Sequence, residues 1–251
     1  MNGPAFATIV FGLAMALAPG AAGAAELKVL AGGGMTVPLR DIGPAFERAS
    51  GHKVEFVFAG TPELIKLATS GQPFDLAIVP VDVFKNADAK AKFVAGPTID
   101  IARVGYGVAV KAGAPKPDIG SPDKLKQALL NAQSVALLPE SAAGAYVMSV
   151  FTRLGITEAM KAKIKPQTTT GAIAQAVAKG DAELGVFLTN VLTAPGVDLV
   201  GPFPGDLQSE LVFTSAVASD SKNASAAKAL LDYLKTPEAT AVLKAKGMTP
   251  G

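Results

Sequence analysis

Residues 30–46 read LAGGGMTVPLRDIGPAF. Three consecutive glycines stand between an apolar run typical of a strand and a segment of helical period, in which Leu39, Ile42 and Phe46 form an apolar stripe. Because glycine has no Cβ, the backbone can turn tightly here and approach another group closely. The stretch predicts a strand, a glycine turn and a helix, the repeating unit of α/β folds.

The rest of the chain repeats this alternation of short apolar runs and helical segments, which predicts α/β layers around mostly parallel sheets. The predicted strands cover residues 27–31, 53–58, 74–79, 103–110, 134–138, 184–188, 197–200 and 211–218. Helix N-caps are predicted at Thr61, Ser121 and Thr236, each of which is followed by proline and an acid. Helices are predicted to stop at Gly51, Gly71, Gly155, Gly180 and Gly247.

Two stretches rich in proline, glycine and polar residues, 110–123 and 201–210, are candidate linkers. They bracket a predicted second lobe, residues 108–205, which is inserted into a first lobe made of residues 25–107 and 206–251. Because the chain crosses twice between these lobes, the sequence predicts a two-stranded hinge.

The N-terminus carries an uncharged apolar block at residues 5–18, followed by helix breakers and then Ala22-Gly23-Ala24. This pattern predicts a secretory signal peptide, residues 1–24, although no Lys or Arg precedes the block. A buried N-terminal helix is the alternative. The 251 residues include no cysteine, which excludes a cysteine-linked lipid anchor and disulfides. We therefore expect a periplasmic protein that is not lipid-anchored.

The charged residues and the single histidine argue against several classes of function. The formal net charge is +2 with no basic stripe, so we expect no nucleic-acid partner. His52 is the single histidine, and without cysteine it has no partner for a transition-metal site. No Ser/His/Asp set or paired carboxylates stand out, so we expect neither catalysis nor a cofactor. Arg40, close to Asp41 and Glu47, is interpreted as a solvated surface residue.

Three junctions share one design: an apolar strand, a few small residues and a helix start. They are VLAGGGMT (29–36), FVFAGTPEL (56–64) and ALLPESAAGAY (136–146). Unpaired N–H groups and partial positive charge at a helix N-terminus favour an anion. Such junctions gather at the carboxyl ends of strands, so we expect two facing lobes to clamp a small anion. Thr168–Thr170 and Thr189–Asn190 offer further polar groups.

Two long segments resemble one known family. They are LKVLAGGGMTVPLRDIGPAFERASGHKVEFVFAGTPELIKLATSGQPFDLAIV (27–79), which contains the element GQPFDL (71–76), and KNASAAKALLDYLKTPEATAVLKAKGM (222–248). Both are similar to the solute-binding proteins of molybdate-type ABC importers. The resemblance implies a type II periplasmic-binding-protein fold, with two α/β lobes and a two-stranded hinge. It also implies a monomer that binds a small oxyanion such as molybdate or tungstate and delivers it to an inner-membrane ABC permease.

The resemblance also implies a binding site. By position, the family's ligand residues fall on Gly34, Thr61, Ala143, Thr170 and Leu188. With neighbouring positions, the expected ligand-binding set is Gly33, Gly34, Met35, Gly60, Thr61, Ser141, Ala143, Thr169, Thr170 and Leu188. No protein-bound metal cation is expected. Gly34 and Leu188 stand where the family has a serine and a tyrosine, so a small organic acid is the alternative ligand. A sensor or enzyme module that reuses the same lobes is the alternative from another class.

Overall fold

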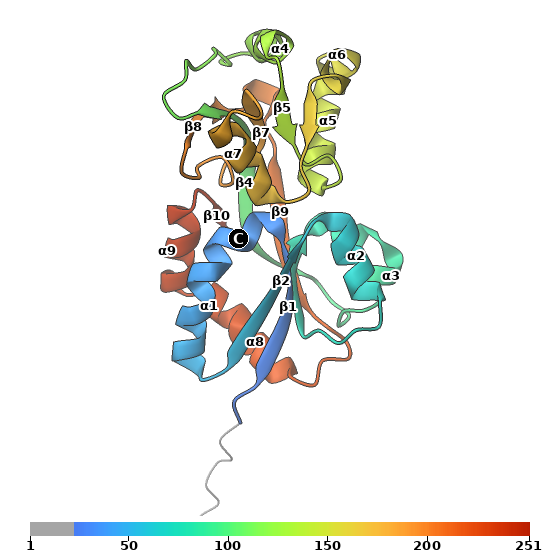
Figure 1. Ribbon diagram of the computed structural model, residues 1–251. Helices are drawn as coiled ribbons and strands as arrows, with labels where there is room; N and C mark the ends of the chain where they lie inside the picture. Colours follow the sequence, from blue (N-terminus) through green and yellow to red (C-terminus); the bar gives the residue numbers. More distant parts are fainter. Residues whose placement is uncertain (1–22) are drawn as a thin grey trace, which may run out of the picture.

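A computed structural model describes residues 23–251, so residues 1–22 of the expected signal peptide lie outside the described part. The described chain forms two α/β lobes, one above the other, joined by long strands (Figure 1). Between residues 23 and 251, no helix combines the length and apolar character needed to cross a membrane.

The first lobe contains the glycine turn. Its central strand lies between two parallel partners, and two further strands continue the sheet in antiparallel fashion. These strands are, in sheet order, β2 (Lys53–Ala59), β1 (Glu26–Gly32), β3 (Leu76–Pro80), β9 (Glu210–Val217) and the first half of β4 (Ile99–Lys111), with β10 (Thr249–Pro250) beside β4.

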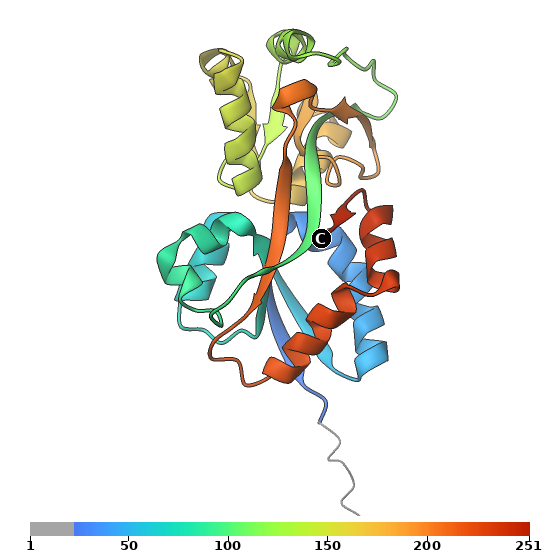
Figure 2. The same ribbon diagram turned by 180° about the vertical axis from the view of Figure 1, so that it is seen from behind.

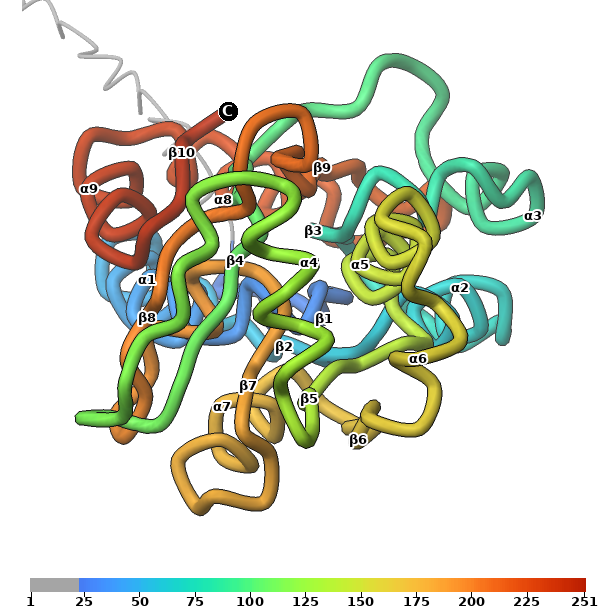
Figure 3. The backbone as a smooth tube through the Cα atoms, turned by 90° about the horizontal axis from the view of Figure 1, so that it is seen from above, coloured from blue at the N-terminus to red at the C-terminus, as the bar shows by residue number. Residues whose placement is uncertain are grey.

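Helices cover both faces of this sheet (Figures 1 and 2). One face carries α1 (Thr36–Ser50), α8 (Ala224–Leu234) and α9 (Pro237–Ala245), and the other carries α2 (Thr61–Thr69), the 3-10 helix η2 (Val81–Lys85) and α3 (Ala87–Lys90). Because strand side chains alternate, Val29 of β1 joins the core under α1 while Leu30 joins the core under α2. From above, α1 and α9 lie on one side of β1, and α2 and α5 on the other (Figure 3).

The second lobe has a smaller sheet. Strands β5 and β7 are parallel, β6 pairs with β5, and both β7 and β8 pair antiparallel with the second half of β4. Its elements are α4 (Pro122–Asn131), β5 (Val135–Leu137), α5 (Ala142–Arg153), α6 (Thr157–Lys161), β6 (Ile164–Pro166), α7 (Thr170–Lys179), β7 (Leu184–Leu188) and β8 (Val197–Pro202), followed by the 3-10 helix η3 (Gly205–Leu207).

The two lobes meet along β4. This strand pairs with β9 up to Gly105 and with β7 from Tyr106, so it changes sheets between these two residues. The described antiparallel strand pairs all involve β4 or β9, while the parallel pairs lie among β1, β2 and β3 in the first lobe and among β5, β6 and β7 in the second. Both sheets are therefore mixed, and the predicted mostly parallel character holds only for the pairs that do not involve β4 or β9. We keep the lobe boundaries, 25–107 with 206–251 and 108–205, as a proposal.

The sequence located most elements correctly. All eight predicted strands are present, but β6 and β10 were not predicted, and β4 begins at Ile99 rather than Arg103. The five predicted helix-stop glycines have φ between 69° and 85°, the left-handed region that favours glycine. Ser121 and Thr236 cap their helices by accepting hydrogen bonds from backbone N–H groups. The apolar stripe of α1 is fully buried, as predicted.

Candidate functional site

The glycine turn lets the two lobes approach each other. After β1, the chain enters a short 3-10 helix, η1 (Gly33–Met35), and then α1. The carbonyl oxygen of Gly33 accepts a hydrogen bond from the Thr170 hydroxyl of the second lobe at 3.1 Å. A Cβ on Gly33 would lie 2.8 Å from the Thr170 methyl carbon, so any side chain would push this contact apart.

Gly34 is also in close contact with the second lobe. Its carbonyl oxygen accepts a hydrogen bond from Nδ2 of Asn190 at 2.8 Å. A Cβ on Gly34 would lie 2.8 Å from the Phe213 ring and 3.0 Å from a Leu188 methyl carbon. Hydrocarbon therefore occupies the space that a serine hydroxyl at position 34 would need.

The predicted N-cap at Thr61 was wrong. Gly60, with an extended backbone, is the N-cap of α2, and it caps without a side-chain hydrogen bond. The Thr61 hydroxyl instead accepts a hydrogen bond from the backbone N–H of Ala142 in the second lobe, at 3.1 Å. This side chain thus connects the lobes rather than closing its own helix.

The third junction is organised by Ser141, the N-cap of α5. Its hydroxyl accepts a hydrogen bond from Gly144 N–H and donates one to the carbonyl oxygen of Leu138, both at 2.9 Å. Because these two contacts occupy the hydroxyl, Ser141 shapes the turn at the start of α5. Thr169 has a similar capping role at α7, where it accepts from Ala172 N–H.

These junctions converge on one small cavity between the lobes, of about 20 Å³, which we call the seam cavity. It is lined by Gly33, Gly34, Ala59, Gly60, Thr61, Pro80, Leu138, Ser141, Ala142, Ala143, Thr170, Phe187, Leu188, Leu211 and Phe213. Eight of the ten expected site residues are in this lining. The exceptions are Met35, which is fully buried in the core, and Thr169, which lines the adjoining space.

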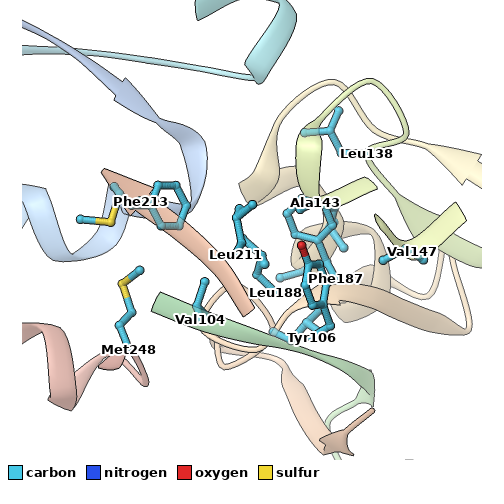
Figure 4. Close-up of a cluster of buried hydrophobic side chains, with 14 of the residues drawn as sticks. Val104, Tyr106, Leu138, Ala143, Val147, Phe187, Leu188, Leu211, Phe213 and Met248 are labelled. Carbon is cyan, nitrogen blue, oxygen red and sulfur yellow. The ribbon is translucent and has the colours of Figure 1, made fainter. Parts of the chain in front are cut away.

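One wall of the seam cavity is hydrocarbon. Figure 4 shows Leu188 and Leu211 lying between the rings of Phe213 and Phe187, with Ala143 above Phe187. The described lining carries no charged side chain. A ligand in this cavity would contact hydroxyl and main-chain groups on one side and apolar carbon atoms on the other.

A larger space of about 980 Å³, which we call the cleft, adjoins the seam cavity. Both share the lining residues Gly33, Gly34, Ala59, Gly60, Leu138 and Thr170. The cleft is also lined by the polar residues Thr36, Arg40, Glu63, Thr168, Thr169, Gln175, Asn190, Thr193 and Lys246. In size it falls within the range of small-molecule sites, roughly 300 to 1,000 Å³.

Arg40 is exposed, as predicted, but it does not pair with the acids near it in the sequence. Its acidic neighbours pair elsewhere, Asp41 with Lys246 and Glu47 with Lys53. Within residues 23–251, Arg40 forms no ion pair, and it lines the cleft. Helical spacing could have indicated this, because Arg40 lies four residues after Thr36 and so on the same face of α1.

The aromatic residues at the hinge are structural. Tyr106 is 2% exposed and packs against the tilted ring of Tyr146, whose hydroxyl donates to the carbonyl oxygen of Leu207. Burial, with a smaller contribution from nearby Tyr146, raises the pKa of Tyr106, so the phenol stays neutral. Neither tyrosine lines the seam cavity or the cleft.

Comparison with known proteins agrees with this geometry. A family model described as bacterial extracellular solute-binding protein matches residues 27–249. The chain belongs to this family. Curated relatives include the molybdate-binding protein ModA of Azotobacter vinelandii, 32% identical over 247 residues, which cover 95% of this chain and 96% of that protein. The predicted resemblance to the molybdate-type proteins is thereby confirmed.

Another relative of this solute-binding protein carries a different name. The aconitate isomerase of a Pseudomonas species is 33% identical over 234 residues, covering 89% of this chain and 87% of that protein. Among solved structures, the periplasmic molybdate-binding protein of Azotobacter vinelandii aligns with a TM-score of 0.74 at 19% identity, over 89% of this chain and 98% of that one. The sulfate-binding protein SubI of Mycobacterium tuberculosis aligns with a TM-score of 0.72 at 16% identity, over 90% of this chain and 87% of that one. These structures confirm the type II periplasmic-binding-protein fold.

Proposed function

We propose that this protein is a periplasmic receptor that binds a small anion between its lobes and delivers it to an inner-membrane ABC permease. The observation that supports this most is the convergence of uncharged junctions from both lobes on the seam cavity. Binding would draw the lobes together about β4 and β9 and so create the surface that a permease recognises. A monomer is sufficient, because both halves of the site come from one chain.

The proposal can be tested by thermal unfolding of the purified protein with molybdate, tungstate, sulfate, phosphate and small carboxylates. A ligand at about 100 times its dissociation constant adds about 2.7 kcal/mol of stability. For a chain of this length, that raises Tm by about 5 °C or more. If no anion in the panel raises Tm, the receptor proposal is wrong.

A substitution at Thr61 tests whether the bound anion sits at the seam cavity. Thr61→Val keeps the shape of the side chain but removes the hydroxyl that accepts from Ala142 N–H. We expect ligand affinity to fall about fivefold or more, because a contact that closes the lobes is lost. Isothermal titration calorimetry with the stabilising anion measures the change.

Thr69→Val is the matched control for this experiment. Thr69 ends the same helix, is exposed, and its hydroxyl donates only to carbonyl groups of its own helix, those of Ile65 and Lys66. Its affinity should equal that of the unmodified protein. Equal affinities for Thr61→Val and Thr69→Val would remove Thr61 from the site.

The aconitate isomerase relative favours a second candidate, an enzyme that isomerises a small unsaturated carboxylate in the same cleft. Incubation of the protein with either aconitate isomer, followed by proton NMR, separates the two functions. Appearance of the other isomer at a rate proportional to protein concentration supports the enzyme. Binding without conversion supports the receptor.

A further inference from the structure

The seam cavity and the cleft differ greatly in volume. The seam cavity, at about 20 Å³, has room for about one water molecule. The adjoining cleft has about 980 Å³ and shares three lining glycines with it, Gly33, Gly34 and Gly60. In this structure, a ligand therefore has room only if most of it lies in the cleft.

The cleft presents one cation that the protein itself does not neutralise. Among the charged side chains that line the cleft, Lys246 pairs with Asp41 at 2.8 Å and Glu63 lies 3.6 Å from Lys66. Arg40 has no such partner within the described residues. A guanidinium offers two parallel N–H donors, which match the two oxygens of a carboxylate.

Asn190 contributes a hydrogen-bond acceptor that lacks a donor. Its side chain is more than nine-tenths buried and lines the cleft. Because the Gly34 carbonyl can only accept, the amide must turn Nδ2 towards it, and Oδ1 is left without a hydrogen-bond donor. A buried acceptor without a donor is unfavourable, and a ligand that donates a hydrogen bond would relieve this.

Arg40 and Asn190 both line the cleft. Asn190 contacts Gly34, and Arg40 follows six residues later along η1 and α1, a rise on the order of 9 Å. Side chains on a helix lean towards its N-terminus, which for Arg40 is the end of α1 that follows Gly34. Since Gly34 and Asn190 belong to different lobes, opening the lobes would expose the amide to an entering ligand.

We propose that the ligand is a short organic hydroxy acid, with a carboxylate bound by Arg40 and a hydroxyl that donates to Oδ1 of Asn190. Molybdate, tungstate and sulfate carry only acceptor oxygens at neutral pH and cannot supply that donor. The proposal rests on the proposed function, because it specifies the ligand class of the same site.

Two pairs of acids that differ by one hydroxyl test this ligand class in the unmodified protein. L-Malate and succinate form one pair, citrate and tricarballylate the other. By calorimetry and thermal unfolding, we expect the hydroxylated member of at least one pair to bind about tenfold more tightly than its partner. Equal binding within both pairs, or no binding of any of the four acids, overturns the proposal.

Variants then assign the two contacts. Asn190→Leu should abolish the preference for the hydroxylated acid, so that both members of the pair bind alike. Arg40→Gln should weaken both members by a similar factor of about ten and leave their ratio unchanged. Arg48→Gln, an exposed change on the same helix away from the cleft, should change neither value. A preference that persists in Asn190→Leu, or unchanged affinity in Arg40→Gln, contradicts the assignment.

The outcomes separate this inference from the receptor proposal. If molybdate, tungstate or sulfate stabilises the protein while hydroxy acids do not, the ligand class is wrong and the receptor function stands. If no anion of either kind has an effect, both are wrong. Because the malate to succinate ratio is measured first in the unmodified protein, the test remains decisive even if Asn190→Leu folds poorly.

Discussion

Replacing Gly144 with alanine is expected to lower the stability of the protein by about 3 kcal/mol, because the new methyl group has no room. Gly144 lies in the first turn of α5, where a Cβ would overlap the carbonyl oxygen of Leu138 and come within 2.8 Å of the Pro139 Cα. Both are backbone atoms and cannot rotate away. For a chain of this length, the loss corresponds to a drop in Tm of about 6 to 12 °C.

The same substitution should also disturb the site. The Leu138 carbonyl accepts the Ser141 hydroxyl, so displacing it moves the turn that presents Ala142 to Thr61. We therefore expect Gly144→Ala to lose the thermal response to whichever anion stabilises the unmodified protein. Scanning calorimetry with and without that anion measures both effects.

Gly171→Ala is a matched control, since Gly171 also lies in the first turn of a helix, α7, and has open space where its Cβ would be. Alanine favours helix over glycine by up to about 1 kcal/mol, so stability should stay the same or rise. Equal Tm values for Gly144→Ala and the unmodified protein would show that the close contact at Gly144 relaxes without cost. A matching loss in Gly171→Ala would mean that the steric explanation is wrong.

Asp75→Ala is expected to cost about 3 kcal/mol for a different reason, the loss of a buried acceptor. Asp75 is 7% exposed, and its two carboxylate oxygens accept hydrogen bonds from Lys28 N–H at 2.9 Å and from the Ser221 hydroxyl at 2.7 Å. These contacts join β1 to the segments that precede β3 and α8. Without the carboxylate, a buried backbone donor loses its partner.

Asp75→Asn distinguishes hydrogen bonding from simple packing. Asparagine can still accept from Lys28 N–H through its carbonyl oxygen, while its amide group donates to the hydroxyl oxygen of Ser221. We expect it to lose less than half as much stability as Asp75→Ala, as measured by urea unfolding. Equal losses in the two variants would contradict the hydrogen-bond explanation. Asp75 belongs to the GQPFDL element, so this part of the family resemblance is explained by folding rather than by ligand binding.

Local signals in the sequence were sufficient for most of the fold. The period of the apolar residues, two in a strand and about 3.6 in a helix, shows which side chains face the core. A glycine that ends a helix is recognisable because only its own backbone must adopt the left-handed conformation. Both signals lie within short stretches of the sequence. The two strands that were not predicted, β6 and β10, span three and two residues, and each contains a proline. Such short segments carry no period, so only their neighbours in the sheet define them.

The location of the candidate site was predictable in part. The sequence indicated which turns should present N–H groups, and eight of the ten expected residues line the seam cavity. It misjudged Thr61, because a threonine before a proline is typical of an N-cap, and no local pattern shows that the hydroxyl has a partner in the other lobe. It also did not show that Arg40 lines the cleft, because an arginine next to acids has the same local sequence whether it pairs with them or faces a cleft.

The sequence by itself determined the order of strands and helices, the glycine turn and the supply of uncharged donors. Only the tertiary structure decided which of these groups meet. The contacts of Thr61 with Ala142, Thr170 with Gly33 and Asn190 with Gly34 join residues 81, 137 and 156 positions apart. They depend on how β4 and β9 hold the two sheets against each other, and a relation between distant strands leaves no local pattern along the chain.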